Sequence, residues 1–434
     1  MKNTKPYDNY TPSGIAWLGD IPQHWEVRKL KYSVSINNGA DYKHIQTDSG
    51  YPVIGSGGRF AYAKEFMYDG EVIFLGRKGT IDKPLYFNGK FWAVDTMFYA
   101  YCKKGNNTKF HYYCATQIPF KLYGTSTALP SMTQTDLKGH YLAYPPLSEQ
   151  TTIARFLDYK LNKIDRFILK KKKLIQLLNE QKAAIINDAV TKGLDPSVKM
   201  KDSGVEWLGD VPEHWEVRKL KYSVRLNKHR IFDNDENITV KIALENIESK
   251  TGRLLNLNEN AFEGVGTIFK NGDVLFGKLR PYLAKVTAPN FEGSCVNEIL
   301  VLSPNHGIWY SDFLKYRMLS SKFIKIVDDS TYGSKMPRAS WDFIGSLKIS
   351  CPSVSEQKAI VFHIEKETAT LNQAIATIEK EIALVQEYRT TLIAEAVTGK
   401  IQIMGNDQWE LDNEAEAFDI EGEMGLDTEG GEEE

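Results

Sequence analysis

Two interleaved repeats constrain the fold of this chain more than any other feature. Residues 13–34 (SGIAWLGDIPQHWEVRKLKYSV) match residues 203–224 (SGVEWLGDVPEHWEVRKLKYSV) at 18 of 22 positions, at an offset of 190. Residues 148–193 and 355–400 both begin with SEQ and end with AVTKG and AVTGK, at an offset of 207. The order is motif, unlike block and helical segment, and then the same three again. The chain is therefore a tandem duplication, for which two similar units are expected.

The two helical segments carry an apolar stripe whose spacing alternates between four and three residues. The stripe keeps one phase over four heptads in both copies, which is typical of a coiled coil. Because a duplicated chain tends to close about a pseudo-two-fold axis, we predict that the two helices pair with each other in antiparallel fashion. The expected helix-pair interface consists of Leu157, Leu161, Ile164, Ile168, Ile175, Leu178, Ile185, Ile364, Leu371, Ile375, Ile378, Ile382, Val385 and Leu392.

The blocks between the repeats are expected to be mixed α/β domains. They are rich in aromatic and β-branched residues, glycine and turn signals, as in residues 51–66, 70–87 and 239–255, which predict short strands. Residues 108–118 and 310–319 predict helices. The predicted fold class is α/β (α+β), with two domains of curved mixed sheets joined by two long antiparallel coiled-coil helices. The predicted boundaries are 1–147 and 195–354 for the domains, 148–194 and 355–406 for the helices, and 407–434 for an acidic disordered tail.

The net charge of −2 hides an uneven distribution of charge. Residues 407–434 hold 13 acidic residues and neither lysine nor arginine, which leaves residues 1–406 with 54 basic against 43 acidic residues and a formal charge of +11. A basic body with a separate acidic tail favours a polyanionic partner such as nucleic acid. The alternative is an ordinary solvated surface with a disordered tail.

Two short correspondences survive between the otherwise unlike blocks. Gly70–Gly79 (GEVIFLGRKG) lines up with Gly272–Pro281 (GDVLFGKLRP), and in both a buried strand runs into a glycine-bearing turn with two cations. Tyr123–Pro130 (YGTSTALP) lines up with Tyr332–Arg338 (YGSKMPR), where small polar residues occupy a tight loop. Basic residues at a rigid strand end are well placed to bind phosphate or a guanine edge. The alternative is a turn that needs its glycine for conformation alone.

The sequence carries none of the common catalytic motifs. It contains no NPPY- or DPPY-type methyltransferase loop, no GxxxxGK[ST] phosphate loop, no HExxH helix and no nucleophile elbow. The repeated pairs His24-Trp25 and His214-Trp215 are interpreted as structural plugs where a strand enters each domain. The four cysteines lack CxxC spacing and no apolar run reaches ~18 residues. We therefore predict no catalytic residue, no metal site, no membrane partner and a cytoplasmic location.

The two repeated motifs, SG(I/V)xWLGD(I/V)PxHWEVRKL and SEQ…AVTKG or AVTGK, resemble those of the specificity subunits of type I restriction–modification systems, over about residues 10–402. The resemblance implies that each block is a target-recognition domain for one half of a bipartite, asymmetric DNA site, and that the helices set the spacer. It implies a non-catalytic, DNA-associated prokaryotic subunit that gathers two adenine-N6 methyltransferase subunits and two ATP-dependent motor/nuclease restriction subunits. Those partners would use S-adenosylmethionine, ATP and Mg²⁺, with no cofactor in this chain.

The residues expected to contact DNA are mostly cations and hydroxyl residues in the strand ends and turns of the two blocks. They are Arg59, Lys64, Arg77, Lys78, Thr80, Lys83, Thr125, Ser126, Thr127, Lys228, Arg230, Lys278, Arg280, Tyr282, Lys285, Ser334, Lys335 and Arg338. The lysine run Lys170–Lys173 pairs either with Glu379 or Glu381 of the other helix or with spacer phosphates. Two other functions stay open: a protein scaffold built on the helix pair, and the recognition half of a self-contained nuclease–methyltransferase.

Overall fold

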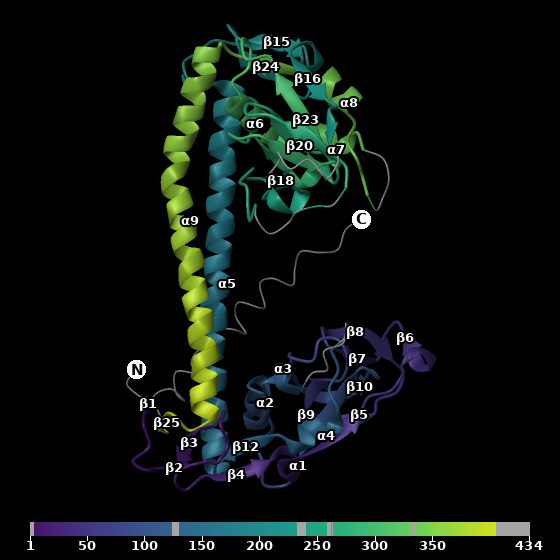
Figure 1. Cartoon of the computed structure of the whole chain (residues 1–434), viewed down its shortest axis with the longest axis vertical. Helices are drawn as coiled ribbons and strands as arrows, with labels where there is room; N and C mark the ends of the chain where they lie inside the picture. The colour runs from purple at the N-terminus through teal and green to yellow at the C-terminus, as the bar shows by residue number, and fades with distance from the viewer. Residues whose placement is uncertain are drawn as a thin grey trace. The chain divides into compact units, whose positions relative to one another are not determined.

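The chain forms two compact units, each of which contains one block together with part of both long helices (Figure 1). The first unit consists of Met1–Lys171 with Lys380–Glu434, and the second of Lys172–Glu379. The structure is a computed structural model that describes residues 4–123, 130–231, 240–257, 262, 264–331 and 336–404.

The two long helices are α5 (Leu147–Lys192) and α9 (Val354–Val397). Helix α5 begins directly after Pro146 and α9 begins two residues after Pro352, and a proline disfavours extension of a helix backwards. Each helix ends before a glycine with a left-handed backbone, at φ +77° for Gly193 and +73° for Gly399. The second helix thus ends before the predicted boundary at residue 406, because the left-handed residue redirects the chain into a short strand.

Within the first unit the two helices run antiparallel. The Asp165 carboxylate accepts from Arg389 Nε at 3.3 Å, and six residues later along α5 the Lys171 ammonium lies 2.7 Å from Glu381 of α9. Every residue predicted for the interface, in both helices, is buried or half-buried. Of the two partners considered for the lysine run, Glu381 is the one that Lys171 contacts.

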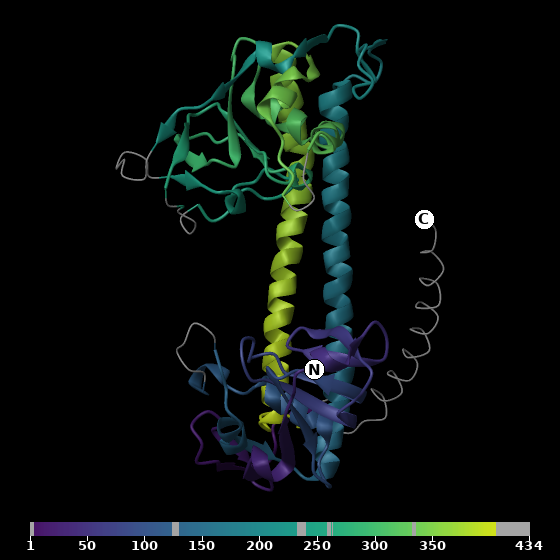
Figure 2. The same ribbon diagram turned by 90° about the vertical axis from the view of Figure 1, so that its right-hand side faces the viewer.

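The second unit repeats the first of these contacts with the roles of the helices exchanged. There Lys182 of α5 donates to Asn372 Oδ1 of α9 at 2.8 Å. At the offset of 207, Asn372 is the counterpart of Asp165 and Arg389 is the counterpart of Lys182. Each unit therefore joins the same two repeat positions, with the roles of the two helices exchanged. The predicted fold class, mixed α/β with two long antiparallel helices, is confirmed (Figures 1 and 2).

The first domain is built on a seven-stranded mixed sheet. Its strands, in the order in which they lie in the sheet, are β5 (Val34–Asn38), β11 (Met97–Cys102), β9 (Tyr68–Gly76), β10 (Leu85–Ala93), β7 (Tyr51–Gly55), β8 (Gly58–Ala63) and β6 (Gln46–Thr47). Strand β7 runs parallel to β10, and the other pairs are antiparallel. The inner strand β9 holds the buried run 72–75, as expected for a strand covered on both faces.

Helix α2 (Thr108–Thr116) connects this sheet to the long helix α5. It contacts β9, β10 and β11 on one side, and the Tyr113 hydroxyl donates to Asp158 of α5 at 2.6 Å on the other. The remaining helices of the first domain are α1 (Leu30–Ser33), the 3-10 turn η1 (Lys43–Ile45), α3 (Phe120–Tyr123) and α4 (Gln134–Gly139). The sheet is thus held against the helix pair through one intervening helix.

The second domain divides its strands between two four-stranded sheets. The first contains, in order, β16 (Val224–Asn227), β23 (Ile299–Pro304), β20 (Val274–Gly277) and β21 (Val286–Thr287), and the second β17 (Arg230–Ile231), β19 (Gly266–Phe269), β22 (Gly293–Val296) and β18 (Lys241–Ile242). Its helices are η2 (Leu220–Tyr222), η3 (Leu244–Asn246), η4 (Pro281–Leu283), α6 (Ser311–Leu319), α7 (Ser321–Asp329) and α8 (Trp341–Ser346). One apolar cluster joins Phe313 and Met318 of α6 to Val190 of α5 and Ile364 of α9.

The repeated motif forms the same two small sheets in both units. In the first unit β2 (Tyr10–Pro12) pairs with β3 (Asp20–Pro22), and β4 (Glu26–Lys29) pairs with β12 (Tyr141–Tyr144). In the second unit β13 (Met200–Asp202) pairs with β14 (Asp210–Pro212), and β15 (Glu216–Lys219) pairs with β24 (Lys348–Cys351). The first unit also pairs β1 (Thr4–Lys5) with β25 (Gln402–Ile403), which joins the start of the chain to the segment after α9.

Two buried histidines make the first unit sensitive to acid. Burial lowers the pKa of His111 and of His140 from 6.5 to about 4. The unfolded chain then binds more protons than the folded unit between these pH values, so stability is complete above pH 6.5 and falls as the pH drops towards 4. At pH 5 we expect a loss on the order of 2 kcal/mol per histidine for the first unit. Hydrogen exchange of the first unit at pH 7 and pH 5, corrected for intrinsic rates, measures the loss.

The matched variant is His111→Asn. The His111 ring contacts the Asn107 carbonyl oxygen through Nδ1 at 2.9 Å, and an asparagine amide can donate from a similar place without titrating. The variant should lose about half of the pH dependence. An unchanged pH dependence would mean that His111 takes no part in it.

Candidate nucleic-acid interface

The first turn, residues 76–83, follows the inner strand β9 of the first domain. The Gly79 N–H donates to the Pro130 carbonyl at 2.9 Å, and the Met132 N–H donates to the Arg77 carbonyl at 3.0 Å. Gly79 has a left-handed backbone with φ +82°. The turn is therefore fixed to Pro130, the last residue of the second correspondence, and to Met132 just beyond it.

The second turn, residues 277–285, follows β20 of the second domain and has the same hydrogen bonds. The Arg280 N–H donates to the Pro337 carbonyl at 2.8 Å, and the Ala339 N–H donates to the Lys278 carbonyl at 2.9 Å. Arg280 also has a left-handed backbone, with φ +53° and ψ +66°. One backbone arrangement thus occurs in both domains.

These hydrogen bonds correct the predicted alignment of the turns by one residue. The sequence comparison set Gly79 against Pro281, whereas the structure sets Gly79 against Arg280 and Arg77 against Lys278. The error arose because the alignment matched the glycines at the starts of the two strands, Gly70 and Gly272. The stretch from that glycine to the turn is one residue longer in the first domain. The first domain consequently has a glycine where the second has an arginine.

In the first turn, Arg77 is held in place, whereas the other predicted residues extend into solvent. Arg77 Nη1 donates to the Asp95 carbonyl at 3.2 Å, and its guanidinium lies 5.9 Å from the centre of the Phe98 ring. Lys78, Thr80 and Lys83 are exposed. A positioned arginine beside free lysines is suited to contact both base edges and phosphates.

In the second turn, two of the predicted cations are already bound within the protein. Lys285 Nζ donates to the Leu244 carbonyl at 2.6 Å, and Arg338 donates to both carboxylate oxygens of Glu298, which raises the pKa of its guanidinium. Lys278 is half-buried, and Arg280 and Tyr282 are exposed. Arg338 thus has part of its charge neutralised, and Arg280 is the cation of this turn that extends into solvent.

The remaining predicted residues are not brought to these turns by hydrogen bonds. Arg59 lies on β8 and Lys64 just beyond it, separated from β9 in the sheet by β10 and β7. Lys228 precedes β17 and Arg230 begins it, and β17 belongs to the other sheet of the second domain. All four are exposed. Thr125, Ser126, Thr127, Ser334 and Lys335 lie outside the described residues.

A glutamate in the first turn of each long helix binds the repeated His-Trp pair. In the first unit Glu149 accepts from the Trp25 indole at 3.0 Å, and its other oxygen lies 2.7 Å from His24 Nε2. Both tryptophans are buried, and a carboxylate is favoured at a helix N-terminus. This contact explains why the His-Trp pair and the SEQ motif occur together in both copies. The sequence alone did not reveal the link, although both motifs occur twice.

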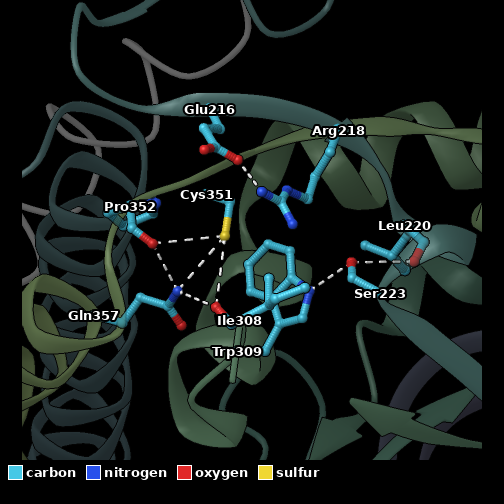
Figure 3. Close-up of polar contacts among 9 residues, drawn as sticks. All are labelled: Glu216, Arg218, Leu220, Ser223, Ile308, Trp309, Cys351, Pro352 and Gln357. Atoms are coloured by element: carbon cyan, nitrogen blue, oxygen red, sulfur yellow. Dashed lines mark hydrogen bonds and ion pairs between the residues drawn. The ribbon is translucent and has the colours of Figure 1, made fainter. Parts of the chain in front are cut away.

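The second unit reproduces this contact. Glu356 accepts from the Trp215 indole at 2.9 Å and lies 3.0 Å from His214 Nε2. The next residue, Gln357, is fully buried, and its amide donates to the carbonyls of Pro352 and Ile308, at 2.9 and 2.7 Å (Figure 3). The long helix is therefore fastened at its first turn both to the repeated motif and to the domain.

Neither a metal-binding cluster nor a membrane-crossing helix occurs among the residues that the structure describes. No group of three or more histidine, cysteine, aspartate or glutamate side chains in this part of the chain is arranged to hold a metal ion. No described helix is long and apolar enough to span a membrane.

The fold defines a class of protein with two mixed α/β domains on a duplicated helical framework. Residues 22–179 match the family model described as the type I restriction modification DNA specificity domain. Over these residues the chain is similar to the DNA specificity domain of type I restriction–modification systems, the family that its motifs indicated.

Two relatives and one solved structure extend this match over most of the chain. The type I restriction enzyme EcoDI specificity subunit of Escherichia coli is 21% identical, over 91% of this chain and 92% of its own length. The type I restriction enzyme MjaVIII specificity subunit of Methanocaldococcus jannaschii is 24% identical over 76% of both chains. A chain from a structure of complex assembly and conformational transition of the type I R-M system has the same fold, with a TM-score of 0.61, 11% identity and coverage of 87% of this chain and 98% of its own.

Proposed function

We propose that this chain is the specificity subunit of a type I restriction–modification system, that each of its domains reads one half of a bipartite, asymmetric DNA site, and that the helix pair sets the spacer. The observation that carries the proposal is the pair of turns with one backbone and different side chains. The same backbone conformation in both turns supports the same role, contact with DNA, at the equivalent place in each domain. Arg77 beside Gly79 in one turn, and Lys278 beside Arg280 in the other, present different donors, which supports two different half-sites.

The helix pair supports the proposed spacing role through its length. The interface stripe of α5, from Leu157 to Ala189, is roughly 48 Å long at ~1.5 Å per residue. One turn of duplex DNA is roughly 34–36 Å. The helices are therefore long enough to keep two reading domains about one turn of DNA apart.

In this proposal, partner subunits carry out the methylation and cleavage of DNA. Two adenine-N6 methyltransferase subunits, and two ATP-dependent motor/nuclease restriction subunits, would bring S-adenosylmethionine, ATP and Mg²⁺. The contribution of this chain would be to hold the duplex in place while a methyltransferase extrudes its target base.

The test is methylome sequencing of a host that expresses this chain with its methyltransferase, together with footprinting at increasing salt. We expect methylated adenines within one bipartite motif, and an affinity that falls steeply as salt rises, because cations that neutralise phosphates release counterions. A purified complex that protects no bipartite sequence at moderate salt would contradict the proposal. Loss of all DNA binding with retention of partner binding would favour the scaffold alternative.

Twin exposed tyrosines are the surface to which we assign the two methyltransferase subunits. Tyr32 and Tyr222 occupy the same position of the repeated motif and are 61% and 75% exposed. A lysine lies against each ring, Lys31 at 5.0 Å and Lys221 at 5.7 Å. Because burial in the unit does not explain a large exposed aromatic that both copies retain, the pair supports binding of two copies of one partner.

Replacing either tyrosine with alanine should remove one methyltransferase from the complex. Loss of an aromatic residue at the centre of an interface costs 2 kcal/mol or more, so we expect at least about 30-fold weaker binding at that site. Native mass spectrometry should give one partner for Tyr32→Ala or Tyr222→Ala and none for the double variant. Phe60→Ala, at an aromatic that is 56% exposed and lies outside the repeats, is the control that should keep two. Two bound partners in the double variant would refute the assignment.

A further inference from the structure

Arg280 combines a strained backbone with an exposed side chain. Its φ of +53° lies in the left-handed region, where the Cβ of an L-residue is crowded and glycine is preferred. It also precedes Pro281, and a residue before proline is pushed towards extended conformations. An arginine at this position therefore lowers the stability of the turn compared with glycine.

The first domain shows that the turn itself does not need this side chain. Gly79 occupies the same position, makes the same hydrogen bond to a proline carbonyl and has the left-handed backbone that glycine adopts readily. The backbone arrangement thus forms with no side chain at all. The side chain of Arg280 is therefore not required for the conformation of the turn.

No contact within the described part of the second unit accounts for the Arg280 guanidinium. Among residues 172–231, 240–257, 262, 264–331 and 336–379, it makes no hydrogen bond or ion pair. Its neighbours differ in this respect, since Arg338 is paired with Glu298 and Lys285 with the Leu244 carbonyl. Arg280 and Tyr282 are both exposed in the turn that follows β20.

We propose that Arg280 reads a guanine edge, and that the half-site of the second domain contains a G·C base pair contacted in the major groove. The inference rests on the proposed function and names a specificity-determining residue within it. A phosphate contact can be made by a lysine on a flexible stem, and it tolerates many positions. Paired donation to O6 and N7 of guanine needs an arginine at a fixed position and angle, and a backbone locked between β20 and Pro281 provides that.

The test compares Arg280→Gly with wild type in the full chain bound to its methyltransferase. The probe is a library of DNA duplexes randomised at one base pair at a time within the wild-type site. We expect the variant to lose a roughly 5- to 150-fold preference for G·C at one position of the second half-site, the value of one paired contact. Every other position, including the whole first half-site, should keep its preference. Arg280→Lys, which retains the charge and loses the paired geometry, should lose the same preference.

Lys250→Gly is the matched control. Lys250 is exposed, has φ +67°, and its N–H bonds the carbonyls of Leu283 and Ala284 at the end of the same turn. The substitution thus removes one charge and relieves the same backbone strain nearby. Both glycine variants should melt no lower than wild type, so a folding defect is separated from a binding defect. The control should keep the preference at every position.

Two results would overturn the proposal. Unchanged preferences in Arg280→Gly would show that Arg280 reads no base. Uniform weakening over all sequences, with the slope of log affinity against log salt reduced by about 1, would show a phosphate contact instead. A wild-type complex without any bipartite preference would contradict the proposed function as well. That outcome differs from the two results above, in which the wild-type complex keeps its bipartite preference.

Discussion

Replacing Trp215 with alanine is expected to destabilise the second unit by about 3–5 kcal/mol, the range for truncating a buried tryptophan. Trp215 is completely buried, its ring meets Phe313 edge-on at 6.4 Å, and its indole N–H binds Glu356. The substitution opens a cavity where the repeated motif, the start of α9 and the domain core meet. Hydrogen exchange followed separately for the two units is the measurement, because a chain with two units need not unfold in one step.

Only the second unit should lose protection in this experiment. The matched variant Trp215→Phe keeps most of the volume and removes the indole donor, so we expect a smaller loss of about 1–3 kcal/mol. Trp25→Ala should produce the corresponding loss in the first unit, where Trp25 contacts Tyr7 and Glu149. Equal destabilisation of both units by Trp215→Ala would contradict the division of the fold described here.

Inserting one heptad into both long helices should move methylation to sites with a longer spacer. Insertion of seven residues beside the Lys171–Glu381 pair lengthens each helix by about 10 Å at ~1.5 Å per residue and keeps the apolar stripe in phase. At ~3.4 Å per base pair, the proposed separation of the half-sites grows by roughly three base pairs. Methylome sequencing of a host expressing the variant reports the new spacer.

The control for this experiment is the same insertion in one helix alone. A single insertion leaves seven residues of one helix without counterparts in the other. The Asp165–Arg389 contact and the Lys182–Asn372 contact then cannot form at the same time. We expect this variant to lose methylation rather than to change its site. Methylation at the old spacing by the double insertion would refute the spacing role of the helices.

The helices could be predicted from the sequence because their signal is local and repeated. A stripe that holds its phase over four heptads, with prolines before it and glycine after it, specifies a helix without knowledge of the rest of the chain. The predicted segment boundary at residue 406 lies beyond the end of α9 at Val397, and Gly399, just after that end, has a left-handed backbone.

The sheets and the polar contacts could be predicted only in part. Strand β9 is recognisable from its apolar run, but neither the seven-stranded sheet of the first domain nor the two sheets of the second can be deduced, since strand pairing joins distant residues. Glu149 and Glu356 looked like ordinary acidic residues at a helix start, because their tryptophan partners lie 124 and 141 residues earlier. Among the residues predicted to contact DNA, the described ones at residues 77–83 share one turn of the first domain, and those at residues 278–285 share one turn of the second. Arg59, Lys64, Lys228 and Arg230 lie on or beside other strands of their domains.

The division of the chain into units also sets an order for its production. The second unit is one continuous stretch, Lys172–Glu379, and all of its residues have been synthesised while the last part of the chain is still on the ribosome. The first unit needs β25 to pair with β1, and the end of α9 to reach α5, so it waits for residues made last. During translation the N-terminal domain is therefore expected to stay incomplete, with its helix-binding surface exposed to chaperones, until the C-terminal segment arrives.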